Sequence, residues 1–195
     1  MDTGRMEAFS DGVLAIIITI MVLELHVPAN EADFSALRPL WPVFLSYVLS
    51  FIYIGIYWNN HHHMLQAAHR VDGRALWANL HLLFWLSLVP FGTAWMGQND
   101  LASAPTAVYG AILLMASIAY FFLARSLVWI HGEGSPLAMA IGGDTKGRVS
   151  AALYLLGVIV ALALPWVAFG IYALVAVIWV VPDRRMVRAL ATGSE

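Results

Sequence analysis

Residues 5–25, RMEAFSDGVLAIIITIMVLEL, form the first apolar segment of the chain and decide its fold class. A stretch of about 20 predominantly apolar residues is long enough to cross the core of a bilayer as a helix. The first turns of this segment nevertheless contain the charged residues Arg5, Glu7 and Asp11. Because a charge in the membrane is costly unless it is paired or hydrated, these residues indicate a role beyond lipid anchoring.

One narrow face of this helix is a candidate functional surface. At about 100° per residue, positions three and four apart fall on one stripe. Here the stripe contains Phe9, Gly12, Ile16, Thr19 and Leu23. It is apolar except for one hydroxyl, and Asp11 lies beside it, which is typical of a pore wall. The alternative is an ordinary lipid-facing helix, in which a lone threonine commonly bonds to its own backbone.

The composition indicates an integral membrane protein. Of the 195 residues, 61% are hydrophobic and 11% are charged, whereas a soluble domain averages about 45–50% apolar and about 25% charged residues. The sequence has no cysteine, which excludes disulfides, thiol catalysis and cysteine-based metal sites. The polar start of the first segment, which lacks a small-residue cleavage site, argues against a removable signal peptide.

Apolar segments recur along the chain and predict six transmembrane helices within one domain, residues 1–195. Prolines and polar turns separate the segments, and the long apolar run after Arg148 is divided near Leu164 and Pro165 into two short helices. The predicted helices cover residues 5–26, 39–66, 75–96, 105–130, 148–164 and 166–182. The sequence therefore predicts an all-α membrane protein without a soluble domain.

The positive charges predict how the chain is oriented. With six helices, most lysines and arginines lie on one side of the membrane: Arg5, Arg70, Arg74, Lys146, Arg148, Arg184, Arg185 and Arg188. Arg125 lies just inside the same end of the fourth helix, and only Arg38 lies on the other side. Because cytoplasmic loops carry an excess of positive charge, both termini are predicted to be cytoplasmic.

Polar residues at one depth predict a buried network around the first helix. Trp58 and His61 share a face of the second predicted helix, and Asn79 lies near the start of the third, at the depth of Arg5 and Asp11. Polar groups in lipid must satisfy one another, so such a network can hold helices together. Alternatively, Asp11 and His61 would form the proton relay of a secondary transporter, although inverted repeats are not found.

Three consecutive histidines, His61 to His63, lack the spacing of a helical metal site. Such a site places two imidazoles three or four residues apart, so that both point at one ion. A histidine-dependent metalloprotein is therefore the weaker alternative, and neither a bound metal nor a cofactor is expected. The sequence contains no HExxH, GxSxG or phosphate-binding glycine loop, so no enzymatic activity is expected.

A pore along the first helix requires several copies of the chain. One such helix cannot enclose a pathway, whereas a cyclic oligomer would place its copies around a common axis. Rings of Ile16 and Leu23 would then form hydrophobic constrictions. A ring of Thr19 hydroxyls between them would replace part of the hydration shell of an ion.

Several motifs of the first half occur together in a known family. RxxxFSD opens the first helix at residues 5–11, followed by II-x-T at 16–19, WxxH at 58–61, NL at 79–80 and PF at 90–91. In this order they resemble the signature of the lysosomal and prokaryotic potassium channel family called transmembrane protein 175. The second half of the chain is similar to the family only in hydropathy and helix count.

The resemblance implies a potassium-permeable channel of a prokaryotic plasma membrane, assembled as a homotetramer around four copies of the first helix. Ile16 would be the hydrophobic constriction, Thr19 the layer that favours potassium, and Leu23 a further pore layer, with Gly12 on the same stripe. The network that holds the first helix would contain Arg5, Ser10, Asp11, Trp58, His61 and Asn79, with Phe9 beside them.

The resemblance also implies the kind of conduction. The family lacks the TVGYG filter of ordinary potassium channels, and this sequence contains no such motif. Leak-like conduction with modest selectivity is expected, because one ring of hydroxyls offers fewer oxygens than a carbonyl filter. Some family members pass protons, so a proton-conducting channel is the nearest alternative.

Overall fold

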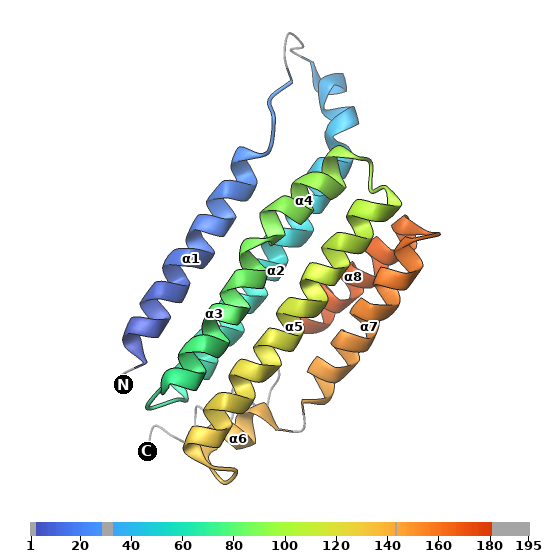
Figure 1. The fold of residues 1–195 in the computed structure, drawn as a ribbon. Coiled ribbons are helices and arrows are strands. Elements are labelled where there is room, and N and C mark those ends of the chain that lie inside the picture. The colour runs from blue at the N-terminus through green and yellow to red at the C-terminus, as the bar shows by residue number, and fades with distance from the viewer. Residues whose placement is uncertain (1–2, 29–32, 143, 181–195) are drawn as a thin grey trace.

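The computed structural model describes residues 3–28, 33–142 and 144–180, which contain helices and no strand (Figure 1). In chain order these are α1 (Gly4–Leu23), the 3-10 helix η1 (Phe34–Leu40), α2 (Trp41–Gln66), α3 (Gly73–Ser87), α4 (Val89–Gln98), α5 (Ser103–His131), α6 (Pro136–Ile141), α7 (Thr145–Ala161) and α8 (Pro165–Val180). The end of the predicted helix 166–182 and the predicted cytoplasmic residues Arg184, Arg185 and Arg188 lie outside the described residues.

Within the described ranges, four helical stretches are long and apolar enough to cross a membrane: Gly4–Leu23, Phe34–Gln66, Gly73–Gln98 and Ser103–His131. Pro165–Val180 is a shorter apolar helix. The prediction of an all-α membrane protein is confirmed by these helices.

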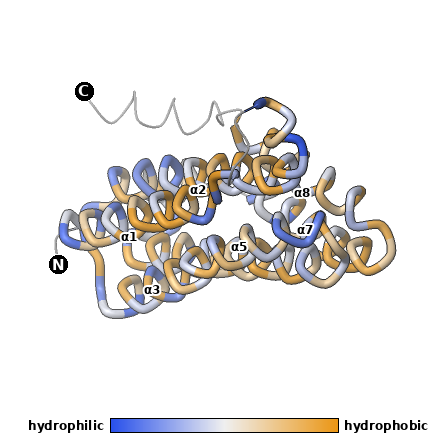
Figure 2. Tube along the Cα trace, turned by 90° about the horizontal axis from the view of Figure 1, so that it is seen from above, coloured by the Kyte–Doolittle hydropathy of each residue, from blue (hydrophilic) through white to orange (hydrophobic). Residues whose placement is uncertain are grey.

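The helices form a bundle with α1 at one edge and α7 and α8 at the other (Figure 1). The first helix packs against α2, α3 and α4, whereas α5 lies in the middle and packs against α3, α4, α7 and α8. Seen from above, the apolar residues extend over most of the helices (Figure 2). The position of α1 leaves one of its sides without a neighbour in the subunit.

Prolines explain two differences from the predicted helices. The helix predicted over 75–96 is interrupted at Leu88, between α3 and α4. Pro90 has no N–H to bond a carbonyl one turn earlier, and its ring crowds that carbonyl. The helix predicted to begin at residue 39 begins at Trp41, with Pro42 in its first turn, where a missing N–H leaves no bond unmade.

The last two described helices, α7 and α8, are 17 and 16 residues long. Helix α7 begins at Thr145, three residues before the predicted start, because the Asp144 side chain caps it by accepting a hydrogen bond from the Gly147 N–H at 3.1 Å. It ends at Ala161, and α8 begins at Pro165, where the sequence analysis divides the apolar run. The connection between the predicted helices 105–130 and 148–164 contains the short helix α6.

Tyr172 joins three helices in the interior of the bundle. The side chain is fully buried on α8 and lies against Gly110 of α5 and Gly157 of α7. A Cβ atom at either glycine would overlap the Tyr172 ring. Glycine at these positions therefore allows the close approach of α5, α7 and α8.

We expect Gly110→Ala to lower the thermal unfolding midpoint of the detergent-solubilised protein. The added methyl group must displace the buried Tyr172 ring, and such overpacking costs about 1–3 kcal/mol. Gly170→Ala on α8 is the matched control, because a Cβ there meets no atom within 4 Å. Alanine should maintain or raise stability at Gly170, since it favours helix by up to about 1 kcal/mol over glycine. Equal midpoints for the two variants would contradict this packing.

Candidate functional site

The first helix has two distinct faces. Its buried face consists of residues spaced three and four apart: Met6, Ser10, Leu14, Ile17 and Met21. The opposite face is exposed, with 56% of Phe9, 58% of Ile16 and 78% of Leu23 accessible, and Gly12 and Thr19 are exposed as well. The structure thus places the predicted stripe on the side of α1 that faces away from its own subunit.

The Thr19 hydroxyl is oriented by its own helix. Its Oγ1 donates a hydrogen bond to the carbonyl of Ile16 at 2.9 Å. Because the proton is directed to the backbone, the oxygen lone pairs are left for a cation or a water molecule. Thr19 therefore adds an oxygen ligand to a surface on which its neighbours Ile16 and Leu23 are apolar.

The buried face of α1 is held by a chain of hydrogen bonds that runs through Ser10. Ser10 Oγ donates to the Met6 carbonyl at 2.8 Å, and Asn79 Nδ2 of α3 donates to Ser10 Oγ at 2.9 Å. The Asn79 Oδ1 atom lies 2.8 Å from His61 Nε2 of α2, which must be the donor because the amide oxygen only accepts. All three side chains are buried, so the bonds join three helices in the interior of the subunit.

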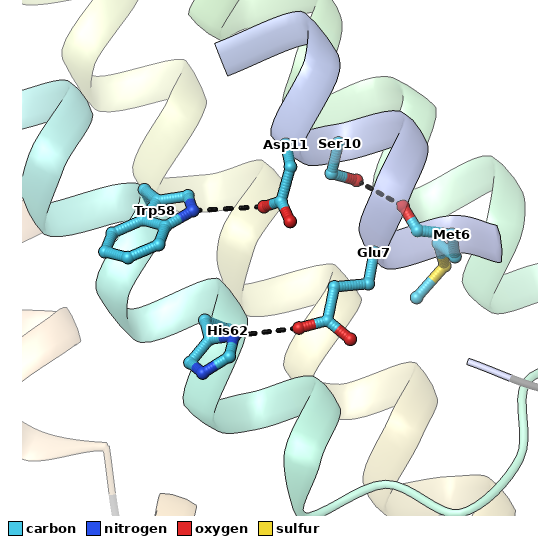
Figure 3. A network of polar contacts seen from close by, with 6 residues as sticks. All are labelled: Met6, Glu7, Ser10, Asp11, Trp58 and His62. Carbon is cyan, nitrogen blue, oxygen red and sulfur yellow. Dashed lines mark hydrogen bonds and ion pairs between the residues drawn. The ribbon is translucent and has the colours of Figure 1, made fainter. Parts of the chain in front are cut away.

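Two further bonds connect α1 to α2 in parallel (Figure 3). Trp58 Nε1 donates to Asp11 Oδ1 at 3.0 Å, and His62 Nδ1 lies 2.8 Å from Glu7 Oε1. The Trp58 and His62 rings stack on each other with centroids 5.8 Å apart and an interplanar angle of 15°. The two carboxylates near the start of α1, Glu7 and Asp11, are therefore hydrogen-bonded to α2, which lowers the cost of a charge near lipid.

We refer to Glu7, Ser10, Asp11, Trp58, His61, His62 and Asn79 as the polar anchor of α1. Five of the predicted network residues belong to it: Ser10, Asp11, Trp58, His61 and Asn79. Two predicted residues do not: Arg5 is exposed, and its side chain makes no hydrogen bond or ion pair among the described residues. Phe9 is exposed on the stripe.

Glu7 and His62 were missed as network residues by the sequence analysis. A signal for them is present, because Glu7 and Asp11 are four residues apart on one helix, as are Trp58 and His62 on the other. Two such pairs on antiparallel helices can face each other at two successive turns. The described residues contain no group of three or more histidine, aspartate or glutamate side chains that could hold a metal ion.

Comparison with known proteins places the chain in a family. The family model described as endosomal/lysosomal potassium channel TMEM175 matches residues 5–90. A potassium channel of Chryseobacterium sp. (strain P1-3) is 52% identical over 190 residues, which cover 97% of this chain and 98% of that protein. The crystal structure of a lysosomal potassium-selective channel TMEM175 homolog from Chamaesiphon minutus is similar with a TM-score of 0.80 and 32% identity, covering 91% of this chain and 96% of that one.

These similarities define a membrane protein of an ion-channel family and not an enzyme. The chain belongs to the TMEM175 family, and the resemblance drawn from its motifs is confirmed. A more distant relative, the endosomal/lysosomal proton channel TMEM175 of Mus musculus, is 29% identical over 168 residues, which cover 77% of this chain and 33% of that protein.

We expect Asn79→Leu to destabilise the protein, because it leaves buried Ser10 and His61 groups without their partner. Each buried polar group that loses its hydrogen bond costs about 1–3 kcal/mol. Asn99→Leu is the control, since Asn99 is exposed and its side-chain amide donates to the carbonyl of Trp95, one turn earlier in α4. Thermal unfolding in detergent should show a lower midpoint for Asn79→Leu than for Asn99→Leu. The same midpoint in both would show that the Ser10 bonds do not stabilise the fold.

Proposed function

We propose that the chain is a potassium-permeable channel of a prokaryotic plasma membrane, with α1 lining the pore of a homotetramer. The observation that carries this proposal is the exposed stripe of α1, which presents the Thr19 hydroxyl between Ile16 and Leu23 while the opposite face is held by the polar anchor. Bacterial relatives named potassium channels support the choice of ion.

The pathway that we propose is mainly hydrophobic. Rings of Ile16 and Leu23 form constrictions that empty of water readily, and Thr19 hydroxyls between them replace part of the hydration shell of the ion. Gly12 lies on the same stripe, where a Cβ would meet no atom of its own subunit within 4 Å. A single hydroxyl layer offers few oxygens, so the channel should leak potassium with modest selectivity.

A cyclic tetramer explains why the stripe is free within one chain. The helix packs on one side only, and a pore requires several copies of it around an axis. In the proposed channel each subunit crosses the membrane six times, with Gly73–Gln98 as one span and α7 and α8 as two short spans.

The charges support a cytoplasmic position for both termini. The start of α1, the connection between α2 and α3 and the start of α7 lie at the same end of the bundle (Figure 1). This end carries Arg70, Arg74, Lys146 and Arg148, whereas Arg38 lies in η1 at the other end. The positive-inside rule assigns the first end to the cytoplasm.

A channel that conducts protons along the same stripe is the second candidate, since a mammalian relative is named a proton channel. A transporter with an Asp11–His61 relay is supported less well. Asp11 bonds to Trp58, whereas the bonds from His61 run through the Asn79 amide and end at a backbone carbonyl. This series of hydrogen bonds fixes the positions of the three side chains. It ends at a backbone carbonyl, which has no proton to pass onward.

We expect Thr19→Val to reduce the preference for potassium over sodium several-fold, because the isosteric side chain removes the oxygen. The measurement is potassium, sodium and proton flux in liposomes that contain the purified protein. Ser87→Val is the control: Ser87 is an exposed residue of α3 whose hydroxyl also bonds the carbonyl three residues earlier. Unchanged selectivity in Thr19→Val would place the selective layer elsewhere. Flux that requires a proton gradient and is lost in folded Asp11→Asn would identify a transporter instead.

We expect Ile16→Asn to raise sodium flux in the same assay, because a polar ring holds water in the constriction. Ile159→Asn on α7 is the control, with a similar exposed fraction of 60% against 58% for Ile16. The control should leave ion flux unchanged if its side chain faces lipid. Equal sodium flux in wild type and Ile16→Asn would exclude Ile16 as the constriction.

A further inference from the structure

A cavity separate from α1 lies between α2, α5, α7 and α8. Its volume is about 260 Å³, and it extends along α2 from Tyr53 to Asn60, which is about two helical turns. Its wall is mainly aromatic, with rings from all four helices: Tyr53, Tyr57, Tyr120, Phe121, Tyr154 and Trp179. The pore stripe and the polar anchor do not account for this cavity.

Two hydroxyl groups in this wall have no hydrogen-bond partner among the described residues. They belong to Tyr57 of α2, of which 7% is exposed, and to the half-buried Ser117 of α5. Within the described ranges, the fully enclosed side-chain polar atoms that lack a partner belong to His61, His63 and Thr106. The Tyr57 hydroxyl is therefore not enclosed by protein atoms, and the cavity is the open space that this buried residue lines.

Two other polar side chains of the wall bond to the protein. Tyr53 donates to the Tyr172 carbonyl at 2.6 Å, which uses its proton. Asn60 Nδ2 donates to the Ile56 carbonyl at 2.8 Å, so its Oδ1 atom remains an acceptor one turn from Tyr57. An occupant of the cavity therefore meets a mainly aromatic wall with a few hydrogen-bonding groups, which is the usual composition of a small-molecule site.

The volume and the wall select the kind of occupant. An engineered apolar cavity of about 150 Å³ holds one benzene molecule, so a volume of about 260 Å³ has room for two fused rings. The wall is fixed by contacts between its own rings, such as that of Tyr57 with Tyr120, whose centroids lie 6.1 Å apart. Aromatic rings that pack edge-to-face or offset gain more than their buried area provides, whereas an acyl chain gains nothing from this geometry. The charged residues of the wall, Asp144 and Arg148, lie at the start of α7 and are of opposite sign.

We propose that the cavity binds a small neutral molecule of two fused aromatic rings with one hydroxyl group, a naphthol in its simplest form. The rings pack against the aromatic wall. The ligand oxygen accepts a hydrogen bond from the Tyr57 hydroxyl, whose proton has no acceptor in the described part of the chain. This site is independent of the ion pathway along α1, so its test does not depend on the proposed function.

The test is a fluorine NMR titration of the purified protein in detergent with a ring-fluorinated naphthol. Partition into micelles does not saturate, whereas binding to the cavity saturates and is displaced by excess unlabelled naphthol. Two further probes separate the contributions: fluoronaphthalene lacks the hydroxyl, and fluorodecanol lacks the rings. We expect the naphthol to bind several-fold more tightly than either. Absence of saturable naphthol binding, or binding of either other probe that is as tight, would overturn the proposal.

Tyr57→Phe tests the hydroxyl without changing the shape of the cavity. It should weaken naphthol binding several-fold and leave fluoronaphthalene binding unchanged, because only the naphthol uses the Tyr57 proton. Tyr47→Phe is the matched control, since it makes the same change on the same helix at a residue outside the cavity wall. Unchanged naphthol binding in Tyr57→Phe, or an equal loss for both probes, would contradict the proposed contact.

A second pair of variants tests the location of the site. Ala151 lines the cavity, so Ala151→Phe should fill it and remove the saturable binding of the naphthol. Ala152→Phe is the matched control, because Ala152 is the next residue of α7, is exposed and is not part of the cavity wall. Circular dichroism and the mass of the purified protein check folding, and Tyr57→Phe decides the question if Ala151→Phe does not fold. Saturable binding that persists in folded Ala151→Phe would place the ligand elsewhere and overturn the proposal.

Discussion

The bonds between Ser10, Asn79 and His61 determine which side of α1 faces away from the subunit. In lipid an unsatisfied polar group costs several kcal/mol, so the Ser10 hydroxyl and the Asn79 amide must meet inside the protein. Turning α1 by one residue, about 100°, would separate Ser10 from Asn79. The same turn would move Ile16 and Thr19 off the exposed side. The rotation of the helix, and with it the chemistry of the exposed stripe, therefore depends on this buried contact.

The sequence predicts those features that depend on local periodicity. The apolar length of residues 5–25 and the spacing of Phe9, Ile16 and Leu23 are enough to predict a membrane helix with one distinct face. Contacts between two helices depend on the relative height and rotation of those helices, which the sequence of one segment does not determine. The contact of His62 with Glu7 was missed for this reason. Arg5 was expected in the network, but it lies at the exposed start of α1, where the side chain can stay in water.

Several features of the helix packing cannot be predicted from the sequence motifs. The break at Leu88 follows from the backbone chemistry of Pro90, which the hydropathy of the segment obscures. The close approach at Gly110 and Gly157 depends on where Tyr172 of a distant helix lies. The cavity lined by Tyr53, Tyr120 and Tyr154 has the same origin, because its wall comes from α2, α5, α7 and α8. Such features arise from complementary shapes and leave no period in the sequence.

The polar anchor has a consequence for how the channel is assembled. All its members belong to one chain, so the conformational entropy of ordering α1 is lost when the subunit folds. In the tetramer that we propose, the subunits then associate with their pore faces already oriented. The entropy of ordering α1 therefore does not reduce the free energy of their association. Because α1 is oriented by contacts within its own subunit, its orientation does not depend on the contacts between subunits. Contacts between subunits can change in the course of evolution without altering the orientation of the Thr19 side chain relative to its own subunit.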